Sequence, residues 1–371
     1  MASAESELQQ RKALALAAHD ASGRVTPIHI SRRDTGDNDV AIKILYCGIC
    51  HSDLHTIKND WRNAIYPVVA GHEITGLVTD VGKNVSRFKV GDRVGVGCMV
   101  NTCQSCESCK DGFENYCSKI VYTYNSRDRD GTVTYGGYSD MVVVNQRFVV
   151  RFPDGMPLDG GAPLLCAGIT VYTPMKYHGL NEPGKSVGVI GLGGLGHVAV
   201  KFAKAFGMRV TVISTSPEKE EEAMEKLGVD TFVVSTDPNQ MKSVMGTMHV
   251  IINTASASMS MYPYLGLLKP QGKMILLGLP VKPLEISAFA LVGGKPVLKK
   301  KGVLLRQDSG RELYGSVGDT QEMIDFAAEH GVTADIELVG AEDVNWAMER
   351  LAKGEVRYRF VIDVGNTLVA A

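Results

Sequence analysis

The sequence predicts an α/β protein in which a strand-rich part precedes a part of alternating strands and helices. Roughly the first 150 residues contain β-branched stretches such as "DVAIKILYCGI" and "YSDMVVVNQRFVVRF", separated by Gly and Asp. From about residue 185, short apolar stretches such as "KSVGVI" and "RVTVIS" alternate with helical stretches such as "GGLGHVAVKFAKAFG" and "PEKEEEAMEKLG". This alternation indicates βαβ units and a doubly wound parallel sheet.

The composition is that of an ordinary globular chain. Its 371 residues suggest two or three domains at roughly 150 residues each. The formal net charge of −2 gives no electrostatic reason to bind nucleic acid or an anionic membrane. The stretch "MASAESELQQRKALALAAHD" lacks the apolar core of a signal peptide, and glycines interrupt the longest apolar stretch. We therefore expect a cytoplasmic protein that binds neither nucleic acid nor membranes.

A glycine-rich motif, "GLGGLG", follows the predicted strand "KSVGVI" and opens a predicted helix. In a dinucleotide-binding Rossmann domain, the first glycine makes the tight turn and the second lets backbone N–H groups approach a pyrophosphate. The third lets the helix pack closely on the sheet. A structural Gly-rich turn is the alternative. The candidate cofactor-binding residues are Gly191, Leu192, Gly193, Gly194, Leu195 and Gly196.

The next predicted strand runs into "STSPEK". NAD-binding domains usually carry an acidic residue here, which accepts hydrogen bonds from the ribose hydroxyls. This chain offers hydroxyls and a cation, which suit a 2′-phosphate that a carboxylate would repel. A solvated loop is the alternative. The pattern predicts NADP(H) binding by Ser214, Thr215, Ser216 and Lys219.

Half of the eight cysteines form a cluster with the spacing C-x2-C-x2-C-x7-C. Cytosolic cysteines are normally reduced, and four closely spaced thiolates can wrap a closed tetrahedral zinc. Disulfides and an iron–sulfur cluster are the alternatives, which the compartment and the lack of other redox spacing disfavour. The predicted ligands of a structural zinc are Cys103, Cys106, Cys109 and Cys117.

The stretch "CGICH" at residues 47–51 fits three kinds of chemistry. C-x-x-C-H attaches haem in c-type cytochromes, C-x-x-C is a redox-disulfide spacing, and a thiol near a His can be half of a zinc site. Further along lie "AGHEITGLV", with His72 and Glu73, and "LLCAG", with Cys166. Cys, His and Cys would supply three ligands and leave a fourth position open, as a catalytic zinc requires.

The segments "GICHSDLH", "GHE", the cysteine cluster, "APLLCAG", "GLGGLGH" and "VRYRFVIDV" together resemble the zinc-dependent medium-chain alcohol dehydrogenases, in particular the plant cinnamyl alcohol dehydrogenase branch. The resemblance covers nearly the whole chain in the right order. It implies a GroES-like β-rich catalytic domain, residues 1–166 and 316–371, and an inserted NADP-binding Rossmann domain, residues 167–315. It also implies a homodimer.

The resemblance also assigns residues. The implied ligands of the catalytic zinc are Cys50, His72 and Cys166, with Glu73 as a transient fourth ligand. Cys47 matches no ligand position and is expected in the core, and Cys98 is expected in the pocket wall or core.

Three further residues match functional positions of the family: Ser52 and His55 the proton relay, and Thr170 a cofactor contact. The implied cofactors are two zinc ions per chain and NADP(H). The implied reaction is the reversible reduction of aldehydes to primary alcohols: NADPH gives a hydride, zinc polarises the carbonyl as a Lewis acid, and the relay supplies a proton.

Two departures from the family pattern leave the activity open. The segment at about 295–319, "KPVLKKKGVLLRQDSGRELYGSVG" and the residue after it, is longer than usual where the family contacts the nicotinamide and forms its dimer interface. A catalytically silent zinc-binding paralogue is therefore a second hypothesis. Tyr122 replaces a Trp, and Trp61 a smaller residue. The substrates left open are phenylpropenyl aldehydes, terpenoid or aliphatic aldehydes, and polyols of the mannitol type.

Overall fold

The structure is a computed structural model that describes residues 11–257, 259–278, 302–304 and 315–369. The chain divides into two compact units: residues 1–166 with 316–371, and residues 167–315. Most of the atypical segment at about 295–319, including the three lysines at 299–301, lies outside the described residues.

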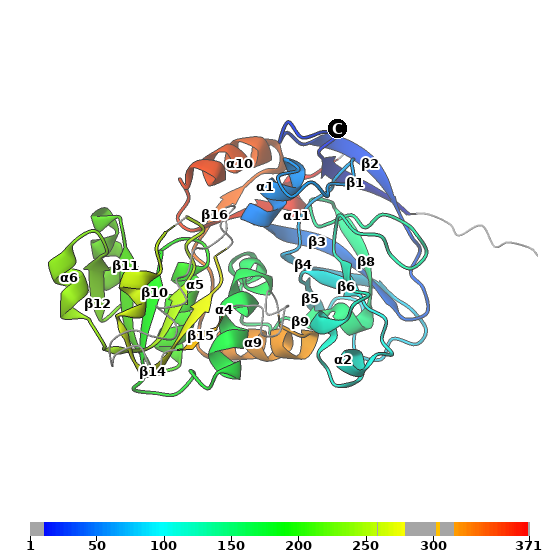
Figure 1. The fold of residues 1–371 in the computed structure, drawn as a ribbon. Coiled ribbons are helices and arrows are strands. Elements are labelled where there is room, and N and C mark those ends of the chain that lie inside the picture. Colours follow the sequence, from blue (N-terminus) through cyan, green and yellow to red (C-terminus); the bar gives the residue numbers. More distant parts are fainter. Residues whose placement is uncertain (1–10, 258, 279–301, 305–314, 370–371) are drawn as a thin grey trace, which may run out of the picture. The chain divides into compact units, whose positions relative to one another are not determined.

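The first unit is built on a mixed sheet in the strand order β16-β17-β3-β4-β5-β9, with β8 also paired to β3 (Figure 1). Its strands are β3 (Asp39–Ile49), β4 (Ile74–Val81), β5 (Arg93–Val96), β8 (Met141–Asn145), β9 (Val150–Arg151), β16 (Ile336–Val339) and β17 (Arg359–Asp363). Two small sheets join β1 (Arg11–Ala17) to β2 (Thr26–Arg32) and β6 (Met99–Asn101) to β7 (Val121–Tyr122). The helices are α1 (His51–Ile57), α2 (Glu107–Lys110), α3 (Leu158–Gly161), α9 (Val317–Glu329), α10 (Val344–Lys353) and α11 (Val364–Thr367).

The register of β3 places the site. Cys47 pairs with Ile74 of β4, and Ile49 pairs with Phe360 of β17 from the C-terminal segment. The end of β3 therefore lies between the start of β4 and the start of β17, strands that are far apart in the sequence.

The second unit is a parallel sheet in the order β12-β11-β10-β13-β14-β15, with helices beside it (Figure 1). Its strands are β10 (Ser186–Ile190), β11 (Arg209–Ser214), β12 (Thr231–Val234), β13 (Met248–Asn253), β14 (Leu268–Leu276) and β15 (Gly302–Leu304). Its helices are α4 (Ala167–Tyr177), α5 (Gly196–Ala205), α6 (Pro238–Ser243) and α7 (Tyr262–Leu265). This strand order is that of a Rossmann domain, whose order reverses between β10 and β13. The predicted α/β architecture is confirmed.

Two predicted elements differ in detail. The β-branched stretch "YSDMVVVNQRFVVRF" contains two short strands, β8 and β9, because the Asn145 side chain accepts a hydrogen bond from the Arg147 N–H and starts a 3₁₀ turn between them. The stretch "PEKEEEAMEKLG" forms a 3₁₀ turn followed by a π-helical turn, in which the Leu227 N–H reaches the Glu222 carbonyl. This wider turn leaves Ala223 and Leu227 both buried.

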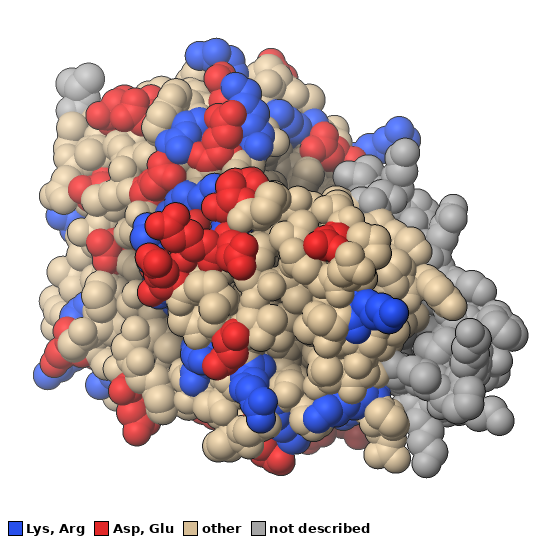
Figure 2. Space-filling model, turned by 90° about the vertical axis from the view of Figure 1, so that its left-hand side faces the viewer, with Lys and Arg blue, Asp and Glu red and all other residues tan. Residues whose placement is uncertain are grey.

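The surface agrees with the small net charge. On the face drawn in Figure 2, acidic and basic side chains are interspersed, with no uniformly basic area among the residues coloured there. None of the helices in the described part of the chain has both the length and the hydropathy of a membrane span.

His249, on β13, gives the second unit a pH-dependent contact. Its Nδ1 accepts a hydrogen bond from the Ser186 N–H at 2.9 Å. Burial and the nearby positive charges of Lys269 and Lys185 lower the pKa of His249. Because the folded state favours the neutral ring, the unfolded chain binds more protons in mild acid, and the folded state is destabilised as pH falls.

We therefore expect the melting temperature of the wild-type protein to decrease between pH 7.5 and 5.5 more than that of His249→Gln, whose amide oxygen can still accept the Ser186 bond. Thermal melts across this pH range measure the difference. Parallel curves for the two proteins would show that His249 does not contribute.

Candidate active site and metal centres

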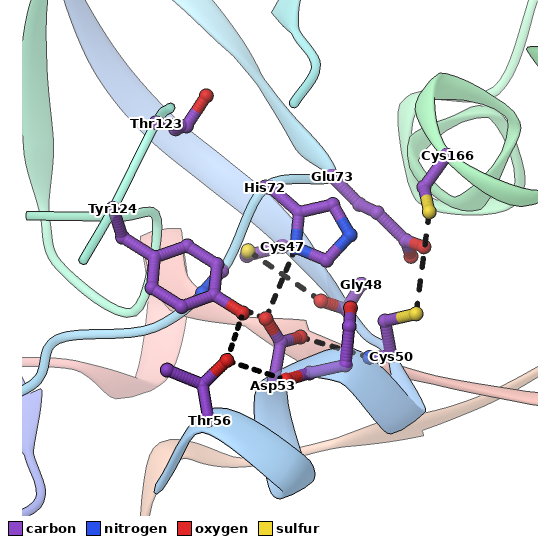
Figure 3. A network of polar contacts seen from close by, with 12 residues as sticks. Cys47, Gly48, Cys50, Asp53, Thr56, His72, Glu73, Thr123, Tyr124 and Cys166 are labelled. Carbon is purple, nitrogen blue, oxygen red and sulfur yellow. Dashed lines mark hydrogen bonds and ion pairs between the residues drawn. The ribbon is translucent and has the colours of Figure 1, made fainter. Parts of the chain in front are cut away.

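One candidate metal centre lies where β3, β4 and the turn before α4 meet in the first unit (Figure 3). Cys50 follows β3 and caps α1, His72 and Glu73 directly precede β4, and Cys166 ends a 3₁₀ turn. The ligand atoms of Cys50, His72, Glu73 and Cys166 all lie within 4.8 Å of one another. The Sγ atoms of Cys50 and Cys166 are 4.0 Å apart. Two thiols and an imidazole converging with a carboxylate are a donor set that suits zinc.

Asp53 organises this centre, and the sequence reasoning missed it. Its buried carboxylate accepts hydrogen bonds from His72 Nδ1 at 3.0 Å, the Cys50 N–H at 2.9 Å and the Tyr138 hydroxyl at 3.1 Å. Because Nδ1 of His72 is used in this way, Nε2 is the ring nitrogen left for a metal. The available signal was the capping pattern C-x-x-D, in which Asp53 occupies the third helical position of α1.

The electrostatics of the centre depend on Asp53. Burial favours the neutral form of His72, but the Asp53 carboxylate outweighs burial, so the pKa of His72 is raised. Burial and the same carboxylate raise the pKa of Tyr138, which keeps its hydroxyl a donor. The hydrogen bond from Cys166 is the main cause that lowers the pKa of the Cys50 thiol, which favours the thiolate that a metal binds.

Glu73 and Arg359 form a buried ion pair beside the ligands. Glu73 is 0% exposed and Arg359 is 3% exposed, and Arg359 Nη2 donates to Glu73 Oε1. Burial raises the pKa of Glu73 to about 7, although the charge of Arg359 opposes the shift. The segment "VRYRFVIDV" was noted only as part of a resemblance, and no role was predicted for Arg359.

The other two cysteines of this region lie near the centre without joining it. Cys47 is fully buried on β3, in agreement with the expected core position. Cys98 is half-buried, and its hydrogen bond with Cys166 lowers the pKa of the Cys98 thiol. Its expected place in a pocket wall or the core stays a prediction.

Ser52 and His55 lie one turn apart on α1, which puts them on the same helical face. His55 Nδ1 lies 2.8 Å from Asp60 Oδ2, and the ring of Trp61 lies 5.4 Å from the His55 ring. Asp60 is a second residue that the sequence reasoning missed, because its contact depends on the turn after α1. With Nδ1 directed to Asp60, Nε2 of His55 is left for proton exchange.

The second candidate metal centre is the cysteine cluster. The Sγ atoms of Cys103, Cys106, Cys109 and Cys117 also lie within 4.8 Å of one another. Backbone N–H groups point at these sulfurs: Cys106 N lies 3.2 Å from Cys103 Sγ, and Lys119 N lies 3.4 Å from Cys117 Sγ. The backbone donors of Ser105 and Cys106 lower the pKa of Cys103 to about 5. This donor pattern fits a closed thiolate zinc site.

In the second unit, the glycine loop connects β10 to α5. Gly191 has φ +86, and the Thr254 hydroxyl, which follows β13, lies within hydrogen-bond distance of the Ile190 and Gly191 carbonyl oxygens. A Cβ on Gly196 would collide with the Gly191 carbonyl, whereas a Cβ on Gly193 would meet nothing within 4 Å. The open space at Gly193 fits the approach of a pyrophosphate to the backbone.

The predicted phosphate residues begin with the last residue of β11, Ser214, and continue after it. Lys219 Nζ donates to the Leu192 carbonyl at 2.9 Å, and the Ser216 N–H donates to Ser214 Oγ at 3.1 Å. The structure thus brings Lys219 to the glycine loop, which sequence spacing alone did not indicate. Thr170 is buried on α4.

Replacing Asp53 by Asn should weaken zinc binding at the first centre by about 10–100-fold, because the neutral amide no longer stabilises the His72 ring as a ligand. Zinc occupancy in competition with a chromogenic chelator measures the change. The cysteine cluster, which has no contact with Asp53 among the described hydrogen bonds, should keep its zinc and serves as the internal control. Equal zinc loss from both centres would contradict this role.

The chain matches known proteins over almost its whole length. Residues 36–154 match the model of the alcohol dehydrogenase GroES-like domain, and residues 194–329 match that of the zinc-binding dehydrogenases. A protein named cinnamyl alcohol dehydrogenase 7, from Oryza sativa subsp. japonica, is 72% identical over 96% of this chain and 94% of its own length. A probable mannitol dehydrogenase from Medicago sativa is 60% identical, with 96% of each chain covered.

Solved structures agree. A cinnamyl alcohol dehydrogenase from Sorghum bicolor has a TM-score of 0.91 and 55% identity, over 97% of this chain and 100% of the other. An enzyme of the same name from Helicobacter pylori, described in complex with NADP(H), has a TM-score of 0.87 and 37% identity over 97% and 100%. With its two thiol-based centres and its Rossmann loop, the chain belongs to the zinc-binding alcohol dehydrogenase family, in the cinnamyl alcohol dehydrogenase group.

Proposed function

We propose that the chain is an NADPH-dependent alcohol dehydrogenase that reversibly reduces aldehydes to primary alcohols, of the cinnamyl alcohol dehydrogenase type. The observation that carries this proposal is the convergence of Cys50, His72 and Cys166 beside helix α1. Three protein ligands leave a fourth position open to a substrate oxygen, which distinguishes a catalytic zinc from a structural one.

The residues present fit both metal ions. Cys50, His72 and Cys166 would hold the catalytic zinc, with Glu73 as an additional oxygen donor, and the four cysteines of the cluster would hold the structural zinc. When bound, the catalytic zinc supplies Lewis acidity toward a carbonyl oxygen, and NADPH supplies the hydride. The GroES-like part, residues 1–166 and 316–371, is the proposed catalytic domain, and residues 167–315 the proposed NADP-binding domain.

Ser52, His55 and Asp60 are the proposed proton path. The Ser52 hydroxyl gives a proton to the substrate oxygen during reduction, and His55 replaces that proton from solvent. The hydrogen bond between His55 Nδ1 and Asp60 holds the ring with Nε2 available. The side chain of His55 is 29% exposed, so it can exchange protons with water.

The hydroxyls and the ammonium group after β11 favour NADPH. Ser214, Thr215 and Ser216 offer donors, and Lys219 offers a positive charge beside the glycine loop. No carboxylate stands at the end of β11 to repel a 2′-phosphate. Thr170 is a proposed further cofactor contact.

Aromatic side chains favour a planar substrate such as a phenylpropenyl aldehyde. Trp61 packs beside the relay residue His55 and is 45% exposed, and Tyr122 is 41% exposed. A large exposed ring beside a relay residue, as Trp61 is, favours flat aromatic molecules. One relative is named as a probable mannitol dehydrogenase, so a polyol is the alternative substrate. We also propose that the protein is a homodimer and is cytoplasmic.

A carboxylate at the end of β11 should change the cofactor preference. We expect Ser214→Asp to lower the preference for NADPH over NADH at least tenfold, because the negative charge repels the 2′-phosphate and accepts hydrogen bonds from a free ribose. The ratio of kcat/KM for the two cofactors measures it. Ser214→Asn, which has a similar size without the charge, is the control. An equal effect of both variants would exclude the electrostatic explanation.

The proposed function itself is tested by the rate of NADPH oxidation by the zinc-loaded protein. We expect turnover with cinnamaldehyde or coniferaldehyde, and loss of at least 100-fold in kcat for His55→Ala with external imidazole restoring part of it. An aliphatic aldehyde, a terpenoid aldehyde, and mannitol with NADP⁺ are tested beside them. Turnover of mannitol alone would favour the polyol dehydrogenase. No turnover with any substrate, despite two zinc ions per chain, would favour the catalytically silent paralogue.

A further inference from the structure

Two residues without an assigned role, Gly48 and Arg359, enclose the carboxylate of Glu73. Gly48 lies on β3 inside the "CGIC" motif, and Arg359 begins β17. The strand pairing brings both to Glu73: the Gly48 N–H donates to the Glu73 carbonyl at 3.0 Å, and Phe360 pairs with Ile49. We call this enclosure the Glu73 seat.

Gly48 provides the space in the seat. A Cβ placed on Gly48 would collide with Glu73 Oε2 and would also lie 2.9 Å from Glu73 Cδ. The φ angle of Gly48 is not in the left-handed region, so the backbone does not require glycine there. The requirement for glycine is therefore steric, and it comes from the Glu73 carboxylate.

Arg359 provides the charge in the seat. Its guanidinium donates to Glu73 Oε1, while Glu73 Oε2 and Arg359 Nε have no hydrogen-bond partner among the described residues. A buried carboxylate oxygen without a partner is costly. The carboxylate is therefore held through one oxygen only, and Figure 3 shows it near the Cys50 and Cys166 sulfurs.

The charges around the metal ligands also indicate a role for Arg359. Glu73 and the Cys50 and Cys166 sulfurs bring negative charge close together in a buried site, and Arg359 is the positive side chain that contacts Glu73 there. An uncompensated buried charge is strongly destabilising. The position of the Glu73 carboxylate relative to the metal ligands therefore depends on its contacts with Gly48 and Arg359.

We propose that Gly48 and Arg359 act as positioning residues, which hold the Glu73 carboxylate back from the metal ligands and so keep the fourth coordination position free for a substrate. Loss of either residue lets the carboxylate compete for that position. This inference rests on the proposed catalytic zinc.

The experiment measures access to the fourth position directly. The catalytic site is loaded with Co²⁺, and its visible absorption spectrum is recorded while imidazole, a neutral ligand, is added. We expect Gly48→Ala and Arg359→Gln to weaken imidazole binding at least tenfold and to alter the spectrum before imidazole is added. Arg359→Lys, which keeps the charge, should have a smaller effect. Gly155→Ala, where a Cβ would meet nothing within 4 Å, should bind imidazole like the wild type.

The decisive variants also lack the carboxylate. If Glu73 is the competitor, Gly48→Ala/Glu73→Ala and Arg359→Gln/Glu73→Ala should bind imidazole as tightly as Glu73→Ala alone. Unchanged binding in both single variants would overturn the proposal, and so would a loss that persists without Glu73. Should Gly48→Ala fail to fold, the comparison of Arg359→Gln with Arg359→Gln/Glu73→Ala tests the proposal by itself. A wild-type protein that retains no metal at this centre would refute the proposed function as well, and metal analysis detects that case separately.

Discussion

The hydrogen bonds of the buried Asp53 carboxylate are the interaction on which the candidate active site depends. One side chain binds the Cys50 backbone, the His72 ring and the Tyr138 hydroxyl, and so joins α1, the start of β4 and the segment before β8. A buried carboxylate must have all these donors, because an unsatisfied charge in the interior is costly. The same bonds that fix the fold here also leave His72 Nε2 for a metal.

Charge compensation explains why so many polar groups are buried together. Glu73 and the thiols of Cys50 and Cys166 would repel one another in a dry interior, and Arg359 is the buried cation that opposes this. The cysteine cluster solves the same problem differently, because backbone N–H groups stabilise its thiolates. The two centres therefore differ as an open and a closed site would: one depends on side-chain charges and the other on its own loop.

Glycines leave space for neighbouring groups in both units, and the group differs from one glycine to the next. Gly193 leaves room for a ligand, Gly196 for the Gly191 carbonyl, and Gly48 for a neighbouring carboxylate. The first two belong to a familiar spacing and were interpreted from the sequence. Gly48 also stands in a motif, but its neighbour Glu73 comes from the segment just before β4, so the motif alone did not indicate its purpose.

Local patterns in the sequence determined the alternation of β10, α5 and β11, the glycine turn and the cysteine cluster, because each depends on residues close together in the chain. The resemblance supplied the grouping of Cys50, His72 and Cys166, which lie far apart in sequence and close together in the structure. Only the tertiary structure placed Asp53 under His72, Asp60 beside His55, and Arg359 on Glu73. The contacts of His72 and Arg359 depend on strand register and side-chain packing, which bring distant residues within hydrogen-bond distance, and the contact of Asp60 depends on the turn after α1; none of them leaves a periodic signal in the sequence.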